Sequence, residues 1–474
     1  MTNSNRRHRG RHALLLLSAS LVIACGPTGA MVGIDRLGYV EGTITAFGSI
    51  WVNGVHLETD GADIIVDDSP GVESDLRVGQ VVRVEAMLSD DGATGVANRV
   101  LFDNEIEGPV ESISLGTNSM VVVGQPVVID ASTSFDDSIS PPSLEGLDEG
   151  DFVEVSGFRD ADGAIRATRL ELRGASDVEL RGIVSGHDEM ESTFFIGSVE
   201  VDYQDATLEG FGAGGIDDGQ IVEVKAPSYT AGVALDADEV ELEDRIGGDD
   251  GFEAEIEGFV TRFVSETDFD VSGRPVTTTA GTVFEGGLAS DLALNVKVEV
   301  EGRFDEAGTL VARKVDIRRA ANVRIDALVD SVDAEAGELT LLGVTFIVDD
   351  RTRLEDKSDA DVSPFSLSDV SPGDYVEVRG GIIGADVVAS QLERDDDDSG
   401  EVSIRGFIDE LNDPDFEVLG VTIETDGLTS FFGVSWTDAD EFFANAEAGD
   451  LVEVDGVETN PTTVLADEVE EQLE

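Results

Sequence analysis

The sequence contains one pattern six times, and this repetition limits the possible folds more than any other feature. Each copy opens with a segment of the type V/I-x-G-x-V and later carries a second segment of the type G-D-x-V-E-V-x-G. The first segments begin at residues 40, 106, 180, 256, 325 and 404, and the second at 76, 147, 216, 292, 370 and 446. The resulting period of 66 to 79 residues exceeds that of common solenoid units, so we expect each copy to be a small domain.

Hydrophobic residues alternate with polar ones inside each copy, which predicts β-strands. In the second segment of the first copy, Val82, Val84 and Ala86 are expected to face inward, and Arg83 and Glu85 outward. An aligned position just before this strand calls for a left-handed backbone, because glycine or asparagine occupies it in every copy. These residues are Gly79, Gly150, Gly219, Asn295, Gly373 and Gly449.

A β-hairpin is predicted between the two segments, most clearly at Asn53-Gly54, the strongest two-residue turn signal. In that register Trp51 lies opposite His56 on the outer face of the hairpin. An outward tryptophan beside a histidine is a candidate contact for a sugar or peptide partner. Packing of the same pair against a neighbouring repeat is the alternative.

Five short strands in about 70 residues favour a small closed barrel, because closure removes exposed strand edges. The predicted fold is therefore all-β: a tandem array of six five-stranded barrels resembling the oligonucleotide/oligosaccharide-binding (OB) fold. A short helix is expected between the third and fourth strands, capped in the last copy by Thr437, and a small open sandwich is the alternative. The predicted domains are residues 38–104, 105–175, 176–246, 252–320, 321–394 and 400–474.

The joints between copies are short and polar, which predicts beads on a string. Six beads in a straight row would span roughly 150 Å or more, and bending at the joints would shorten this. Together, the repeated opening, the hairpin and the G-D-x-V-E-V-x-G segment resemble the bacterial family called domain of unknown function 5666, over about residues 38–474. The shared motifs are glycines and strand valines, so the resemblance implies a fold and supplies no catalytic or binding residues. The fourth copy is expected to be among the more divergent.

The first residues have the composition of a secretory signal, with four arginines followed by the short apolar run 13–24. This run ends in Val22-Ile23-Ala24-Cys25, which resembles the lipobox of bacterial lipoproteins. The resemblance implies cleavage after residue 24, a lipid on Cys25, residues 25–37 as a tether, and outer-membrane sorting because Gly26 follows the cysteine. The alternatives are a soluble secreted protein and a buried structural thiol.

Composition argues against several functions. The formal net charge of −71 repels nucleic acids, so we expect no nucleic-acid partner, and we interpret most of the charge as solvated faces. Beyond the signal, only His56 and His187 remain as histidines and Cys25 is the single cysteine. That supply argues against Cys–His or Ser–His catalysis and against zinc, so we expect no catalytic residues and no cofactor.

Calcium is a weaker expectation. The densest acidic run, Asp395, Asp396, Asp397 and Asp398, is a weak calcium candidate, with a flexible acidic linker as the simpler interpretation. The sequence thus predicts a lipid-anchored, non-catalytic repeat protein of the cell envelope. It would act as a structural spacer or as a binding module for an envelope protein or glycan. The alternatives are a divalent-cation-binding envelope protein and, less favoured, a carbohydrate-active enzyme.

Overall fold

The computed structural model describes residues 36–89, 92–130, 132–212, 214–243, 251–318, 322–360, 362–383, 386–396, 400–433 and 435–472. Almost all of the regular structure is β-strand, as predicted. The signal, the tether and Cys25 lie outside the described residues. None of the described helices is long and apolar enough to cross a membrane.

The first repeat is a closed five-stranded barrel. Its strands are β1 (Arg36–Ala46), β2 (Ile50–Val52), β3 (Val55–Glu58), β6 (Val81–Leu88) and β7 (Thr94–Phe102). Antiparallel pairing joins β1 to β2, β2 to β3, β7 to β6 and β6 to β1, and the parallel pair β3–β7 completes the ring. The short strands β4 (Asp63–Val66) and β5 (Ser69–Pro70) lie beside β7.

The other five repeats follow the same order of strands. Repeat 2 comprises β8 (Ile106–Ser114), β9 (Ser119–Val122), β10 (Gln125–Val128), β11 (Ser134–Phe135), β12 (Phe152–Arg159) and β13 (Ile165–Arg173). Repeat 3 comprises β14 (Val178–Asp188), β15 (Thr193–Ile196), β16 (Val199–Asp202), β17 (Thr207–Glu209), β18 (Ile221–Ala226), β19 (Leu235–Asp236) and β20 (Glu239–Leu242). Repeat 4 comprises β21 (Glu253–Ser265), β22 (Asp268–Val271), β23 (Arg274–Thr277), β24 (Val283–Glu285), β25 (Lys297–Phe304) and β26 (Leu310–Arg318). Repeat 5 comprises β27 (Val323–Asp333), β28 (Glu338–Leu341), β29 (Val344–Ile347), β30 (Arg353–Asp356), β31 (Tyr375–Ile383) and β32 (Asp386–Asp395). Repeat 6 comprises β33 (Glu401–Asn412), β34 (Asp415–Val418), β35 (Val421–Glu424), β36 (Ser430–Phe432), β37 (Leu451–Asn460) and β38 (Thr463–Glu471).

The connection between the third and fourth barrel strands contains a helix in repeat 6 only, α1 (Ala439–Asn445), among the described residues. The predicted cap is wrong by one residue: the Asp438 carboxylate, not Thr437, accepts the Glu441 N–H at 2.9 Å. Thr437 lies outside the helix and donates its hydroxyl to the Glu441 carboxylate. Repeats 1, 2, 4 and 5 carry a single 3-10 turn in the same connection.

Glycines of the repeated motifs occupy positions where the backbone requires them. The five aligned glycines before the fourth barrel strand have φ between 89° and 102°, and Asn295 has φ 64°, which confirms the predicted left-handed turn. The glycine of the opening motif makes room for the hairpin turn: a Cβ on Gly42 would lie 1.9 Å from the Asn53 side chain. Likewise, a Cβ on Gly108 would lie 2.3 Å from Val123.

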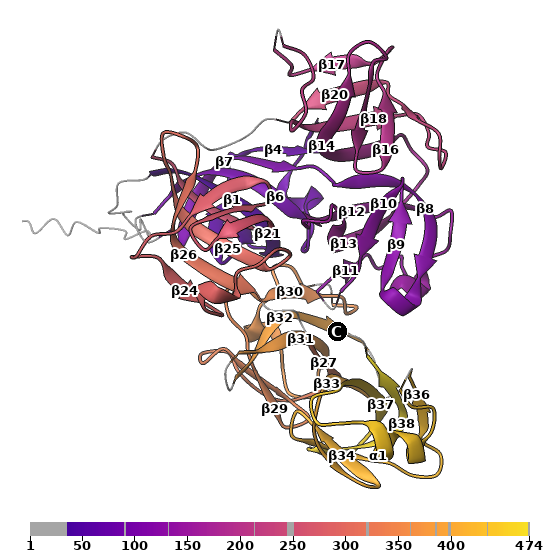
Figure 1. Ribbon diagram of the computed structural model, residues 1–474. Coiled ribbons are helices and arrows are strands. Elements are labelled where there is room, and N and C mark those ends of the chain that lie inside the picture. Colours follow the sequence, from indigo (N-terminus) through magenta and orange to yellow (C-terminus); the bar gives the residue numbers. More distant parts are fainter. Residues whose placement is uncertain are drawn as a thin grey trace, which may run out of the picture.

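The prediction of beads in a row is wrong, because the barrels pair with one another through their opening strands (Figure 1). Repeat 1 pairs with repeat 4 through the parallel strands β1 and β21, which are about 215 residues apart in the chain. Repeats 2 and 3 pair through β8 and β14, and repeats 5 and 6 through β27 and β33, both antiparallel. The barrels pair in this way because part of the opening strand has an unpaired backbone edge within its own barrel. In the first barrel β2 covers only the second half of β1, from Ile44 onward, and residues 38–41 bond to β21 instead.

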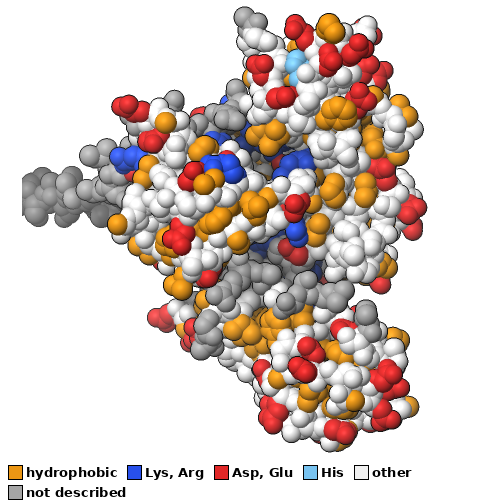
Figure 2. Space-filling view, in the orientation of Figure 1, with side chains coloured by type: hydrophobic (Ala, Val, Ile, Leu, Met, Phe, Trp, Pro, Cys, Tyr) orange, Lys and Arg blue, Asp and Glu red, His pale blue; other side chains and the backbone are white. Residues whose placement is uncertain are grey.

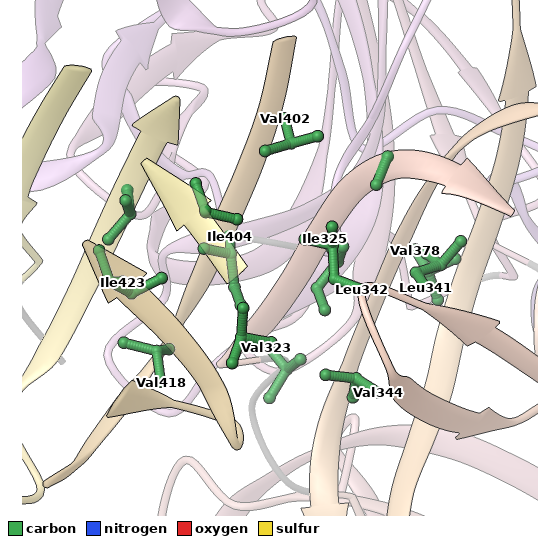
Figure 3. Packing of buried hydrophobic residues seen from close by; sticks show 14 of the residues in the cluster. Val323, Ile325, Leu341, Leu342, Val344, Val378, Val402, Ile404, Val418 and Ile423 are labelled. Carbon is green, nitrogen blue, oxygen red and sulfur yellow. The ribbon is translucent and has the colours of Figure 1, made fainter. Parts of the chain in front are cut away.

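Cores merge in two of the three barrel pairs, whereas the paired repeats 1 and 4 keep separate main clusters. One cluster of buried side chains runs through repeats 5 and 6, and Ile325 and Ile404 lie opposite each other on the paired strands β27 and β33 (Figure 3). A second continuous cluster joins repeats 2 and 3. Repeats 2 and 3, and likewise repeats 5 and 6, are therefore expected to behave as single packing units.

The expected solvated faces are also partly wrong. Val82, Val84 and Ala86 are fully buried as predicted, but the outward residue Arg83 is only 9% exposed. Its guanidinium forms an ion pair of 2.5 Å with Glu243 of repeat 3. Outer faces of the barrels thus form the contacts between repeats, and charged residues on those faces are buried there.

An inter-repeat cavity as the candidate functional site

A cavity of about 770 Å³ lies where repeats 1, 2, 4 and 5 meet. No single barrel forms it, because each repeat contributes one part of the wall. The charged residues in the lining are Asp130, Arg166, Glu257, Glu285, Asp291, Lys297, Asp316, Arg318, Asp349, Arg351 and Arg353. In a chain with few basic residues, five in one cavity is a local concentration of basic side chains, which face six acidic ones in the same lining.

Glu257 joins repeat 4 to repeat 1 at one wall of the cavity. Its carboxylate accepts hydrogen bonds from the Thr43 N–H and hydroxyl, both at 2.9 Å, and pairs with Lys297 at 2.7 Å. Burial alone would raise the pKa of Glu257, but the Lys297 ammonium and the Thr43 N–H outweigh it and lower the pKa to about 2. Glu257 is therefore an ionised, fully satisfied structural group.

Arg353, at the start of β30, is the least compensated cation of the cavity. It is 5% exposed, and its hydrogen bonds go to neutral oxygens of repeat 2: the Thr168 carbonyl at 3.1 Å, the Ser132 carbonyl and the Ser134 hydroxyl. No carboxylate of the described residues lies within ion-pair distance of it. Burial lowers the pKa of its guanidinium, and the more distant carboxylates of Glu257 and Asp130 oppose this shift without overcoming it. A buried guanidinium without a direct ion-pair partner favours the arrival of an anion.

Arg351 is the second incompletely used cation. Its two terminal nitrogens lie 3.5 Å from the Glu299 and Asp316 carboxylates of repeat 4. Its Nε is buried and donates to no described residue. An unused buried donor costs free energy, which a ligand with an acceptor oxygen would recover.

The acidic residues of the lining are largely occupied by other contacts. Asp130 and Asp349 each accept backbone N–H groups within their own turns, and Asp316 lies 3.6 Å from Arg318. The groups that remain available to a ligand are the Arg353 guanidinium and the Nε–H donor of Arg351. The arrangement can bind a small polar ligand that carries an anionic group such as a carboxylate or phosphate.

The predicted contact pair has the expected geometry but lies apart from this lining. Trp51 and His56 are cross-strand partners, and their rings stack at 4.7 Å between centroids. His56 Nε2 lies 3.0 Å from the Gly48 carbonyl. Asn53, in the turn between them, lines the cavity, while both rings stay half-buried outside it. A role of the pair in partner binding stays a prediction.

The weak calcium candidates are only partly described. Asp397 and Asp398 lie outside the described residues, as does Cys25. Asp395 and Asp396 use their carboxylates to accept backbone N–H groups, of Asp396 and Asp359 respectively. The two described carboxylates belong to neither of the three-carboxylate groups that the described residues form.

Sequence reasoning missed the cavity because its walls come from four repeats. Arg351 and Arg353 lie in the connection that varies most in length between copies, so no aligned motif marks them. The sequence does contain one signal: basic residues are scarce, with 30 against 101 acidic residues, so two arginines two residues apart stand out. Figure 2 shows on one face that Lys and Arg side chains gather where the repeats meet, whereas Asp and Glu spread over the periphery.

Fold and cavity together define a class of protein: a tandem of small closed β-barrels docked around a shared, charged cavity. The chain belongs to the family described as Domain of unknown function (DUF5666), whose model matches residues 38–100, 107–171, 257–316, 326–393 and 405–470. The fourth repeat is among the matched segments. Residues 172–256, which hold the third repeat, lie outside these five matches.

Other comparisons add little. No curated protein matches the chain. A solved structure, drosophila Unr CSD456, is similar at 13% sequence identity with a TM-score of 0.14, over 45% of this chain and 99% of its own. A likeness at that score carries no argument, and the OB-like assignment of the barrels stays a prediction.

Proposed function

We propose that this protein is a non-catalytic binding protein of the bacterial cell envelope, which takes a small ligand with an anionic group into the cavity between repeats 1, 2, 4 and 5. The observation that supports it is Arg353, a buried guanidinium at the cavity wall that bonds only to neutral oxygens. Buried cations of this kind are costly unless a partner arrives, which makes them characteristic of anion sites.

The docked repeats favour the binding role over the role of a spacer. A spacer needs length, and length requires that successive domains stay apart. Here repeats 1 and 4 share a strand pair although two other repeats separate them in the chain. That arrangement shortens the molecule and brings residues of four repeats to one cavity. It therefore favours ligand binding over spanning a distance.

We further propose that the protein is located at the outer membrane, where a lipid on Cys25 anchors it. Its support is the sequence Val22-Ile23-Ala24-Cys25 after a basic and apolar start. Several acyl chains on one residue give a firm anchor at about 0.8 kcal/mol per buried methylene. Radiolabelled palmitate is expected to label the wild-type chain, and Cys25→Ser is expected to abolish labelling and to release the protein from membranes.

The ligand is tested by capture. The purified chain is incubated with an envelope extract and washed, and the retained small molecules are identified by mass spectrometry. We expect one anionic compound to be retained by the wild type, and its retention to fall at least tenfold in Arg353→Gln. Arg313→Gln, which removes an arginine that is 56% exposed, is the matched control and should retain it fully. If Arg353→Gln retained the compound as fully as Arg313→Gln does, the proposed site would be rejected. It would also be rejected if the wild type retained no anionic compound.

A further inference from the structure

A second group of charged side chains lies away from the cavity, at the junction of repeats 1 and 3. Three glutamates occupy neighbouring strands in one register: Glu209 on β17 lies beside Glu241 on β20, and Glu241 lies opposite Glu223 on β18. Asp68, from the turn between β4 and β5 of repeat 1, completes the group. In Figure 1, β4 runs toward the strands of repeat 3.

The carboxylate oxygens of this group converge. One oxygen from each of Asp68, Glu223 and Glu241 lies within 4.8 Å of the others. Glu209, Glu239 and Glu241 form a second such group, which shares Glu241 with the first. Like charges directly opposite in a sheet destabilise it, so this register needs a compensating positive charge.

Glu223 is the observation that singles this group out from ordinary surface acids. It is only 4% exposed, and no described residue donates a hydrogen bond to it or pairs with it. The nearest basic group on its own strand, the Lys225 ammonium, lies 2.5 Å from Asp68 and 3.7 Å from Glu179 and acts on Glu223 only at longer range, without an ion pair or hydrogen bond to it. A buried carboxylate with no partner, aimed at two further carboxylates, points to a missing cation.

We propose that Asp68, Glu223 and Glu241 bind a calcium ion that links repeat 1 to repeat 3. Ca²⁺ takes six to eight oxygen ligands at about 2.3–2.6 Å, so ligand oxygens separated by up to 4.8 Å can share one ion. Water molecules complete the shell on the side of Asp68, which is exposed. All three donors are carboxylates, which suits a hard cation such as calcium better than zinc, whose sites contain histidine or cysteine among the ligands.

The electrostatics of the junction agree with this assignment. Burial raises the pKa of Glu223 to about 9: the Lys225 ammonium opposes this shift, and the Asp68 and Glu179 carboxylates add to it. Burial, followed by the neighbouring carboxylates, raises the pKa of Glu241 to about 7. Without a cation, these groups therefore hold protons near neutral pH, and calcium competes with those protons. The site is independent of the cavity, so its failure would leave the proposed ligand site untouched.

The test is a calcium titration of the purified chain at fixed ionic strength and neutral pH, by calorimetry and by thermal melting, with magnesium as the matched ion. Calcium is expected to bind and to raise the melting temperature more than an equal concentration of magnesium does. The double variant Glu223→Gln/Glu241→Gln is expected to bind calcium at least tenfold more weakly. In chelator it is expected to melt at the same temperature as the wild type or higher, because Gln carries no charge, as protonated Glu does, and is not repelled by the neighbouring carboxylates.

The control is Asp395→Asn/Asp396→Asn, which removes the same charge from the acidic run and should keep the full calcium response. A melting temperature in chelator that is no lower than that of the wild type separates a lost site from a variant that fails to fold. A wild type whose calcium response does not exceed the magnesium response would overturn the assignment. So would a response that survives in the glutamate variant.

Discussion

At the scale of single residues, charge does structural work in this protein that the sequence does not reveal. Glu257 is an example: in the linear sequence it is one of 101 acidic residues, yet it holds repeat 4 to repeat 1 through Thr43 and is neutralised by Lys297. Its pKa of about 2 in the folded state lies well below the ordinary 4.5. A group with a lowered folded pKa stabilises the protein above its unfolded pKa and loses this effect as pH falls.

Glu257→Gln is therefore expected to destabilise the chain by about 2–3 kcal/mol at pH 7. The difference from wild type should shrink as pH falls from about 4.5 to about 2 and vanish below that, because wild-type Glu257 is then protonated too. Thermal melting across this pH range measures it. Glu306→Gln, at an exposed position of the same repeat, should show no such difference. A constant difference at every pH would mean that the carboxylate charge is irrelevant.

Residues also explain how far sequence reasoning reached. The aligned glycines and Asn295 were predictable because a left-handed turn leaves a mark on one position in every copy. The tight approach of Gly42 to Asn53 was not, since it depends on how the hairpin folds back over the opening strand. Residue type favours particular local conformations, but it does not determine which distant segments come into contact.

At the scale of elements, the opening strand has two tasks. Its second half closes its own barrel, and its first half pairs with another barrel. The alternation of hydrophobic and polar residues predicted the first task, because one face of the strand fills a core. It could not predict the second, since pairing along a strand edge uses backbone groups that every sequence possesses.

Shared pairing predicts shared unfolding. Ile404 on β33 is fully buried in the core that repeats 5 and 6 have in common. Ile404→Ala is expected to cost about 2–4 kcal/mol and to speed hydrogen exchange in the strands of both repeats. Mass spectrometry of exchanged peptides would show this.

Ile256→Ala is the matched control, because Ile256 is equally buried on the opening strand of repeat 4 but belongs to another core. It should leave exchange in repeats 5 and 6 unchanged. If Ile404→Ala affected repeat 6 alone, the two barrels would be independent units despite their paired strands.

At the scale of the whole molecule, basic residues hold the repeats together and the acidic residues remain in excess at the periphery. Ion pairs between repeats include Arg83–Glu243, Arg274–Glu41 and Arg324–Glu453. Other cations bond to backbone carbonyls of a neighbouring repeat, as Lys357 does to Phe135. Because such contacts are largely buried, salt should screen them much less than it screens the outer charges.

This arrangement fixes the size of the molecule in solution. A single compact body of this length has a radius of gyration of roughly 22 Å, and a lobed one somewhat more. A straight row of six barrels about 25 Å wide would instead give about 45 Å. We expect small-angle X-ray scattering of the purified chain to give a value below about 30 Å. Since added salt relaxes the outer repulsion and leaves the buried pairs intact, that value should stay constant from about 0.05 M to about 1 M sodium chloride. A radius near 45 Å at any of these concentrations would mean that the barrels separate in solution and that the shared cavity does not exist there.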